Sequence, residues 1–335
     1  MLRLQPQGDI MKTSIPRAVA LAPALIVVLG WIGPAAANPT FTTFDVPGAV
    51  EIYPLGIANN RIAGTWWDGT TYHGFLRKPN GNIVTFDPSG STATAVCCIN
   101  ASGEIAGSYS DASSRHGFIR HAGGGITSFD PPNGDGEVKV GGINSGGAVS
   151  GDDGFTEFFL RDSGGNFTEF QLDNGAVKYV GGINDAGYMT GTTQFLCSPD
   201  CSTASGFIRE PNGNITQFIV PGDTYTFGVA IDQNRRITGS YGLPDQNHGG
   251  YVRRPDGMFS TFAYAGKSID YGKVTGSFQN AQGHERGFIR TPNGNINIFH
   301  VPGSTDTYAA SISNGIVTGY YFDANNVAHG HFRTP

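Results

Sequence analysis

Short apolar-rich runs, each ended by glycine, asparagine, aspartate or proline, follow one another along the chain from Phe41 onward. Runs of about four to eight residues bounded by turn residues are typical of β-strands. None of them has the three-to-four-residue spacing of apolar positions that an amphipathic helix needs. The pattern therefore predicts an all-β protein.

One of these runs recurs seven times in nearly the same form, His-Gly-Phe-Ile-Arg. Its copies are His73–Arg77, His116–Arg120, Glu157–Arg161, Ser205–Arg209, Gly249–Arg253, Arg286–Arg290 and His329–Arg333. Successive copies end 37 to 48 residues apart, close to the length of a four-stranded propeller blade. Because every copy ends in arginine, we expect the arginines to make contacts between blades or between strand and loop, and not to form a binding ring.

Each repeat divides into four predicted strands. The first carries Gly-Ile-Asn or a relative, the second resembles Ile-Ala-Gly-Ser-Tyr, the third is His-Gly-Phe-Ile-Arg and the fourth is Ile-x-x-Phe. Asn80-Gly81 stands between a third and a fourth strand, and Asn59-Asn60 between a first and a second. Both pairs accept the positive φ of a two-residue hairpin turn, so we predict such turns at both places.

The two ends of the repeat region predict how the ring closes. The seventh repeat has no fourth strand of its own, whereas residues 40–46 form a fourth strand without a blade. Pairing the two removes the exposed edges of an open sheet. We therefore predict a single seven-bladed β-propeller over residues 38–335. Its blades span residues 47–87, 88–130, 131–170, 171–218, 219–262, 263–299, and 300–335 together with 40–46.

The repeat resembles the HAF-type extracellular repeat family, exported bacterial proteins built from a Gly-Ile-Asn…Gly…His-Ala-Phe unit. The resemblance covers nearly all of residues 41–335. This chain has glycine in place of the middle alanine and arginine where the family often has tryptophan. The resemblance implies export and a propeller fold, and it implies no catalytic motif.

The first 37 residues have the features of a signal peptide. Lys12 and Arg17 precede an apolar stretch from Ala18 to Ile32, and Ala35-Ala36-Ala37 forms a small-residue cleavage site. Met11 is the expected translation start. We predict a mature protein from Asn38 that is secreted or periplasmic and does not insert into a membrane after cleavage.

Composition narrows the range of partners. The chain has 50 glycines, 14 % charged residues and a formal net charge of −6, which becomes −8 without the leader. The mature part has no basic run, so nucleic acid is not an expected partner. No nucleotide, metal or nucleophile motif is present, and we predict no metal and no cofactor.

Four cysteines in an exported chain predict disulfides. Cys197 and Cys201 bracket a turn-forming Ser-Pro-Asp and are expected to pair. Cys97 and Cys98 are adjacent, and they form either a vicinal disulfide or two buried thiols near the central channel. Buried small residues are the favoured interpretation for this pair.

Candidate function is expected where loops vary, on the face formed by the second-to-third loops and the crossings between blades. Blades 7, 1 and 2 share an Asp/His pair flanking the second-to-third loop. Trp67 and Tyr72 add aromatic rings to this blade 7–1–2 sector. The ligand-binding candidates are Trp67, Asp68, Tyr72, His73, Asp111, Arg115, His116, Asp323 and His329.

Two interpretations of the Asp/His pairs stay open. They close each loop with a local hydrogen bond, or they form a polar groove for a ligand, in which His73 and His116 are candidate catalytic bases. We predict a non-enzymatic exported module that binds a glycan or another exported protein through this sector. The alternatives are a polysaccharide lyase or hydrolase using the same residues, and a structural component of the envelope or matrix.

Overall fold

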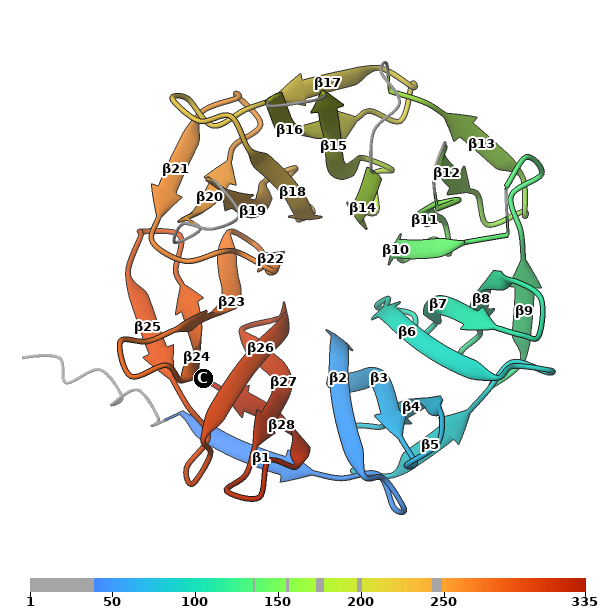
Figure 1. The fold of residues 1–335 in the computed structure, drawn as a ribbon, viewed down its shortest axis with the longest axis vertical. Coiled ribbons are helices and arrows are strands. Elements are labelled where there is room, and N and C mark those ends of the chain that lie inside the picture. The colour runs from blue at the N-terminus through green and yellow to red at the C-terminus, as the bar shows by residue number, and fades with distance from the viewer. Residues whose placement is uncertain (1–38, 135, 155–156, 173–177, 198–200, 243–248) are drawn as a thin grey trace, which may run out of the picture. The chain divides into compact units, whose positions relative to one another are not determined.

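The protein is described from a computed structural model that places residues 39–134, 136–154, 157–172, 178–197, 201–242 and 249–335. These residues form seven four-stranded antiparallel sheets arranged in a ring (Figure 1). In each sheet one strand lies next to the central channel and the others follow outward. The predicted fold class, a seven-bladed β-propeller, is confirmed.

The first four blades each use four consecutive strands. Blade 1 contains β2 (Glu51–Ala58), β3 (Arg61–Trp67), β4 (Tyr72–Arg77) and β5 (Ile83–Phe86). Blade 2 contains β6 (Ala93–Ile99), β7 (Ile105–Ser110), β8 (Arg115–Arg120) and β9 (Ile126–Phe129). Blade 3 contains β10 (Lys139–Ile143), β11 (Val149–Asp152), β12 (Phe158–Arg161) and β13 (Phe167–Phe170). Blade 4 contains β14 (Lys178–Ile183), β15 (Met189–Cys197), β16 (Cys201–Arg209) and β17 (Ile215–Phe218).

The ring closes through the predicted exchange of a terminal strand. Blade 5 contains β18 (Thr226–Ile231), β19 (Ile237–Tyr241), β20 (Gly249–Arg253) and β21 (Phe259–Phe262). Blade 6 contains β22 (Ser268–Asp270), β23 (Lys273–Gln279), β24 (Glu285–Arg290) and β25 (Ile296–Phe299). Blade 7 contains β26 (Asp306–Ser313), β27 (Ile316–Phe322), β28 (Ala328–Thr334) and β1 (Thr40–Phe44). Strand β1 pairs with β28 from Thr40 opposite Thr334 to Phe44 opposite Gly330.

The glycine of the third strand is required by the packing of the fourth. In blade 2, a Cβ atom on Gly117 would lie 2.2 Å from the ring of Phe129, the fourth-strand phenylalanine. The next residue along, Phe118, is fully buried in the core between blades 1 and 2. The Gly-Phe dipeptide of the repeat therefore leaves room for one aromatic ring and supplies another.

The arginines of the repeat join each blade to the preceding one. Each guanidinium carbon lies 4.8–5.4 Å from the centroid of a phenylalanine ring of the neighbouring blade, as Arg120 does over Phe86. A cation over an aromatic face is attracted by the ring quadrupole. The interpretation of these arginines as scaffold is confirmed.

The Gly-Ile-Asn motif makes a second set of contacts between blades. The Asn100 side chain donates to the carbonyl of Asn144 at 2.8 Å, Asn144 donates to Asn184 at 3.2 Å, and Asn184 donates to Asp232 at 3.1 Å. Each asparagine also caps its own turn, as Asn100 Oδ1 does by accepting the backbone N–H of Glu104. The asparagine recurs because it satisfies its own turn and the next blade together.

Of the two hairpin turns predicted in blade 1, one agrees with the structure and the other differs. Asn59 and Asn60 form a two-residue turn with φ of 48° and 60°. Between the third and fourth strands, however, Lys78 pairs with Asn82 and the loop has three residues, with Gly81 at φ 90°. The expectation of a two-residue turn there was wrong, because a glycine that follows a turn adds one residue as a bulge.

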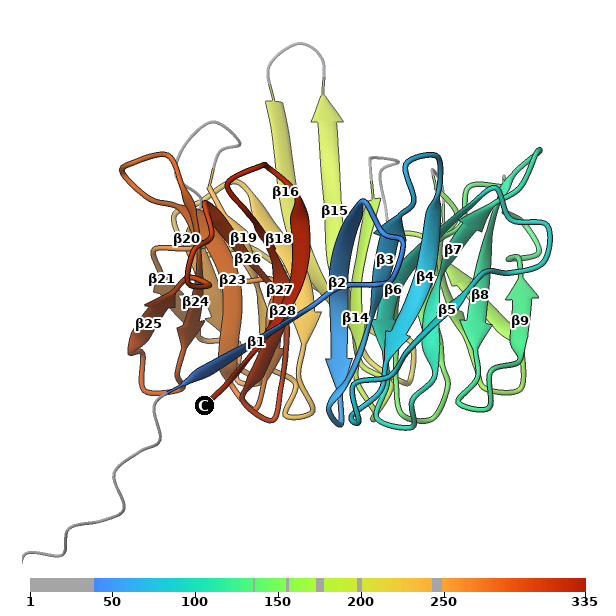
Figure 2. The ribbon, with the colours of Figure 1, turned by 90° about the horizontal axis from the view of Figure 1, so that it is seen from below.

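The second-to-third loops and the crossings between blades lie on one face. Backbone hydrogen bonds join the two loop sets, from Arg115 N–H to the Gly136 carbonyl and from Ala204 N–H to the Thr224 carbonyl. We call this the loop face. Strands β15 and β16 have nine residues each, and their hairpin extends beyond the others on this face (Figure 2).

Candidate functional site

On the loop face of blade 1, His73 is held between two carboxylates. Its Nδ1 lies 2.7 Å from Asp87 Oδ2 and its Nε2 lies 3.2 Å from Asp68 Oδ2. The other oxygen of Asp68 accepts the backbone N–H groups of Thr70 at 2.6 Å and Thr71 at 2.8 Å, which forms an Asx turn. We call this arrangement the Asp–His–Asp clamp.

The same clamp recurs in blades 2 and 7. In blade 2, His116 Nδ1 lies 2.9 Å from Asp130 and Nε2 lies 3.1 Å from Asp111. In blade 7, His329 Nδ1 lies 2.8 Å from Asp45, and Asp323 is 3.7 Å from Nε2. In blades 1 and 2 the Asp/His pair closes its own loop with a hydrogen bond, as the first of the two sequence interpretations expected, whereas in blade 7 the pair is a longer contact.

The clamp favours the charged form of each partner. Partial burial by itself lowers the pKa of His73, but the hydrogen bonds to Asp87 and Asp68 outweigh it, and the net pKa is raised. The pKa of His116 is raised in the same way by Asp130 and Asp111. The pKa of Asp68 is strongly lowered, chiefly by the backbone N–H of Thr71. An imidazole with a carboxylate at each nitrogen is poorly placed to take a proton from a substrate.

Sequence analysis missed the second carboxylate of each clamp. Asp45, Asp87 and Asp130 each follow the fourth-strand phenylalanine, and a histidine is the second residue of the third strand in the same blade. Blade 3 has Gln171 and Glu157 at the two positions, and there the side chains form a hydrogen bond of 2.9 Å. The two positions change together within the chain, and this co-occurrence is the signal that could have identified the pair.

A groove lies between blades 1 and 2 on the loop face. Its volume is about 310 Å³. Two sequence-predicted residues line it, Tyr72 and Arg115, together with Thr65, Ala93, Thr94, Ala95, Ser108, Tyr109 and Ser110. Tyr72 is 41 % exposed, and its ring centroid lies 4.7 Å from that of half-buried Trp67. The structure therefore brings three of the candidates, Trp67, Tyr72 and Arg115, to one place.

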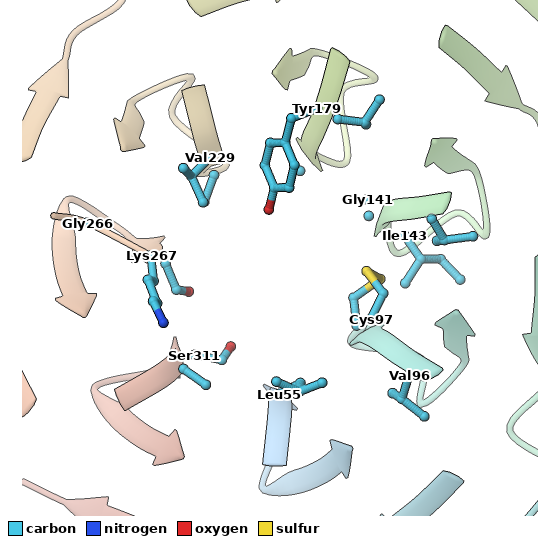
Figure 3. Close-up of a pocket in the computed structure, with 18 of the residues that line it drawn as sticks. Leu55, Val96, Cys97, Gly141, Ile143, Tyr179, Val229, Gly266, Lys267 and Ser311 are labelled. Carbon is cyan, nitrogen blue, oxygen red and sulfur yellow. A yellow bond between two sulfur atoms is a disulfide. The ribbon is translucent and has the colours of Figure 1, made fainter. Parts of the chain in front are cut away.

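The central channel forms a larger cavity than the groove, and sequence analysis used it only to place the cysteines. Its volume is about 800 Å³. All first strands except β22 contain a β-bulge, and the extra residue faces the axis, as Leu55 and Val229 do (Figure 3). Bulges of this kind are a common way to redirect a side chain next to a site. Lys267 and Tyr179 also point into the channel in this view.

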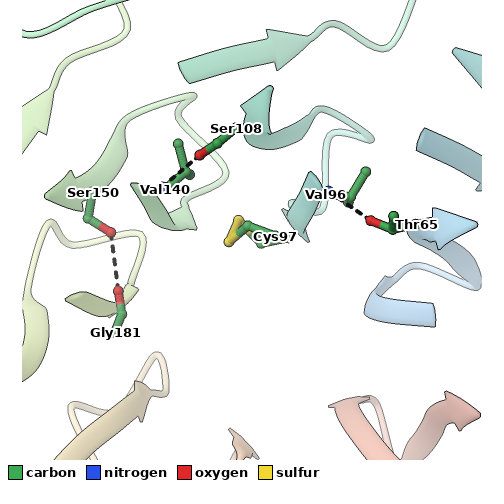
Figure 4. The surroundings of a disulfide bond; sticks show 8 residues. Thr65, Val96, Cys97, Ser108, Val140, Ser150 and Gly181 are labelled. Atoms are coloured by element: carbon green, nitrogen blue, oxygen red, sulfur yellow. Dashed lines mark hydrogen bonds between the residues drawn. A yellow bond between two sulfur atoms is a disulfide. The ribbon is translucent and has the colours of Figure 1, made fainter. Parts of the chain in front are cut away.

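Asp152 supplies the one carboxylate among the described residues that line the channel, and its pKa is raised. It is 3 % exposed, and burial raises its pKa to about 6, although the ammonium group of Lys139 acts in the opposite direction. In the repeat it occupies the position after the second-strand glycine, where other blades have residues such as Thr65 and Ser108. Those hydroxyls accept a backbone N–H of the next blade, from Val96 at 3.0 Å and Val140 at 3.2 Å (Figure 4).

Cys97 and Cys98 form a vicinal disulfide that lines the channel. Both residues are partly exposed, so the favoured interpretation as buried small residues was wrong. The cause is the bulge in β6, which turns Cys97 out of the ladder and toward the axis (Figures 3 and 4). The backbones of Cys197 and Cys201 are partners at the end of the β15–β16 hairpin, but their predicted disulfide lies outside the described side chains.

The described residues contain neither a metal-ligand cluster nor a membrane-spanning helix. No group of three or more His, Cys, Asp or Glu side chains in the described ranges is arranged to hold a metal ion. Within the same ranges, no helix has the length and apolarity needed to cross a membrane.

Comparisons with known proteins support the fold and no more specific relationship. No family model and no curated protein matches the chain. Virginiamycin B lyase from Staphylococcus aureus matches over 89 % of this chain and 100 % of its own, with 12 % identity and a TM-score of 0.60. The propeller domain of the Trilobed protease from Pyrococcus furiosus matches over 85 % and 95 %, with 12 % identity and a TM-score of 0.62. At such identities the chain is similar to these proteins as a β-propeller.

Proposed function

We propose that this propeller is an exported, non-enzymatic binding protein that takes a carbohydrate in the groove between blades 1 and 2. The observation that carries the proposal is the composition of the groove, which joins an exposed aromatic ring, an arginine and several hydroxyl groups in about 310 Å³. A sugar ring stacks its apolar face on an aromatic side chain while its hydroxyls meet polar partners. Export and membership of the HAF-type repeats stay predictions within this proposal.

Tyr72 in the groove and Trp67, which packs against it, stand at positions that differ from blade to blade, and this supports a role beyond the scaffold. The position of Trp67 holds Ser110 in blade 2 and Phe322 in blade 7. The position of Tyr72 holds Arg115 in blade 2 and Ala328 in blade 7. Neither aromatic residue is demanded by the repeat.

The enzyme alternative has less support from the same geometry. A polysaccharide lyase or hydrolase would need a free base in the blade 7–1–2 sector, and both nitrogens of His73 and of His116 face carboxylates. The structural-component alternative predicts neither binding nor turnover.

Binding to a glycan array and to insoluble polysaccharides tests the proposal. We expect Trp67→Ala and Tyr72→Ala each to weaken retention about tenfold, since stacking contributes about 1 kcal/mol or more. Tyr271→Asn is the matched control, because Tyr271 is 58 % exposed in the turn between β22 and β23 and its φ of 46° suits asparagine. Equal retention by Trp67→Ala, Tyr72→Ala and the control would remove the groove from the proposal.

Turnover separates binding from catalysis. The wild-type protein is incubated with neutral and uronic-acid-rich polysaccharides, and released products are measured. We expect no release above that of heat-denatured protein. Release that disappears in His73→Ala or His116→Ala would overturn the non-enzymatic proposal.

A further inference from the structure

We propose that the central channel is a ligand site of its own, which binds a small organic anion with an apolar body between Lys139 and Lys267. This site is separate from the groove between blades 1 and 2 and does not depend on the carbohydrate proposal. The channel volume of about 800 Å³ falls within the range of small-molecule pockets, about 300–1,000 Å³.

The two lysines come from opposite sides of the ring. Lys139 begins β10 in blade 3, and Lys267 directly precedes β22 in blade 6 (Figure 1). Lys267 extends its ammonium group toward the axis (Figure 3). Both lysines are exposed and both line the cavity. A ligand that fills the channel is therefore able to reach both ammonium groups.

Neither lysine is neutralised by an ion pair. Within the described part of the chain, no carboxylate lies at ion-pair distance from either ammonium group. Most other lining side chains are apolar or small, including Leu55, Val229 and the Cys97–Cys98 disulfide. Low-polarity walls strengthen the interaction of unpaired cations with an anion and also offer surface to an apolar body.

The acidic residues near the channel are engaged elsewhere or buried. Glu51 accepts the hydroxyl of Tyr53 at the rim. Asp306 accepts the backbone N–H of Glu285 at 2.7 Å, and the Glu285 carboxylate acts on Lys267 beyond ion-pair distance. Glu51, Glu285 and Asp306 do not line the cavity. Asp152 is the one carboxylate among the described lining residues, and only 3 % of it is exposed.

Asp152 makes the affinity of the site for anions depend on pH. The charged or titratable groups around it are Lys139 on the paired strand, the adjacent Asp153 and Tyr179 of blade 4. Burial raises the pKa of Asp152 to about 6, so the carboxylate loses its charge as the pH falls through that value. The negative charge beside Lys139 is then removed, and anion binding tightens.

Two fluorescent probes of nearly the same shape test the site. The anion is 8-anilinonaphthalene-1-sulfonate, and its uncharged relative is N-phenyl-1-naphthylamine. We expect the sulfonate to bind with one-to-one stoichiometry, and Lys139→Met and Lys267→Met each to weaken it about tenfold, because a hydrogen bond to a charged group contributes about 1.5–3 kcal/mol. The uncharged probe should bind equally to all three proteins.

Two further variants locate the probe. Lys78→Met is the matched control, because Lys78 is exposed in the turn after β4 and should leave both affinities unchanged. Leu55→Trp narrows the channel without changing its charge, and both probes should bind less tightly. Circular dichroism and thermal unfolding confirm that each variant is folded. Equal sulfonate affinity in the wild type and both channel-lysine variants would overturn the proposal, as would equal affinity in the wild type and Leu55→Trp.

The pH dependence provides an independent readout. Sulfonate affinity of the wild type should rise about threefold to tenfold as the pH falls from about 7.5 to about 5, by the removal of one nearby charge. Asp152→Asn should bind at pH 7.5 as tightly as the wild type does at pH 5 and should show no pH dependence. An unchanged slope in Asp152→Asn would overturn the role given to this carboxylate.

Discussion

Charged side chains have close partners in the loop sector of blades 7, 1 and 2, whereas the lysines of the central channel do not. In the loop sector, every charge of the Asp–His–Asp clamp has a partner, and the clamp recurs in three blades. In the channel, no carboxylate of the described residues lies within ion-pair distance of Lys139 or Lys267, and Asp152 and Glu285 act on them only at longer range. Asp152 there replaces the hydroxyl residue of other blades.

This difference in pairing distinguishes residues of the scaffold from residues of a candidate site. A residue that recurs at the same place in successive blades satisfies the same neighbour each time, as the arginines and the Gly-Ile-Asn asparagines do. A residue that departs from the repeat can keep that contact, as Asp152 does by accepting the backbone N–H of Val180. A departure that also costs stability indicates another role. The channel and the groove each contain positions that vary, such as Asp152 in the channel and Tyr72 in the groove.

His331 departs from the repeat inside the core, lines neither candidate site, and shows what such a departure costs in stability. His331 stands where other blades have a buried aromatic residue such as Phe75, and it is 0 % exposed with its Nδ1 unpaired. Burial lowers its pKa from 6.5 to about 4. The folded state thus resists protonation that the unfolded chain accepts, and stability is lost as the pH falls from 6.5 toward 4.

We expect His331→Phe to remove this loss. By pH 4 the variant should exceed the wild type by about 3 kcal/mol in the pH-dependent part of its unfolding free energy, at about 1.4 kcal/mol per pKa unit. Chemical denaturation between pH 4 and pH 8 measures it. His300→Phe, at an exposed position, should keep the wild-type pH dependence. A wild-type slope in His331→Phe would show that another group causes the acid sensitivity.

The arginine ring should respond uniformly to substitution. Arg120→Met keeps much of the apolar stem but removes the cation over Phe86, and we expect a loss of about 1 kcal/mol. Arg254→Met, at a side chain that is 50 % exposed, should change stability by less than about 0.5 kcal/mol. Equal effects of the two variants would contradict the role of the ring in joining blades.

The clamp should give the smallest effect, with the opposite pH dependence to His331. Asp87→Asn weakens a partly exposed pair, so we expect a loss of about 0.5–1 kcal/mol below pH 6.5. Because the pKa of His73 is raised in the folded state, this contribution should fade as the pH rises through that raised value. Asp130→Asn should behave alike in blade 2. NMR titration of the His73 ring, showing a lower pKa in Asp87→Asn, checks the cause.

Most of the fold could be predicted because the sequence contains seven copies of the same four-strand repeat. The spacing of the arginines predicted the number of blades, and the fourth-strand pattern of residues 40–46 predicted the closure through β1. The three-residue loop at Gly81 was missed, since the same Asn-Gly pair serves two kinds of turn.

Less of the candidate site could be predicted, because its geometry depends on bulges and on contacts between blades. The sequence does not show that Leu55 and Cys97 leave the ladder and face the axis. Nor does it show that Asp87 reaches across from the fourth strand to His73. Comparison of the seven repeats position by position does single out Asp152, but the sequence alone does not place it on the wall of the channel.

The unfolding free energy of Asp152→Ser, measured against the wild type from pH 4 to pH 8, tests directly whether Asp152 departs from the repeat at a cost in stability. If Asp152 is a costly departure from the repeat, serine restores the hydroxyl of other blades. The wild type should lose stability as the pH rises through the raised pKa of about 6, and the variant should not. We expect Asp152→Ser to be more stable by about 2–3 kcal/mol at pH 8 and equal at pH 4. A variant that is less stable than the wild type at pH 8 would show that Asp152 belongs to the scaffold and would contradict the account.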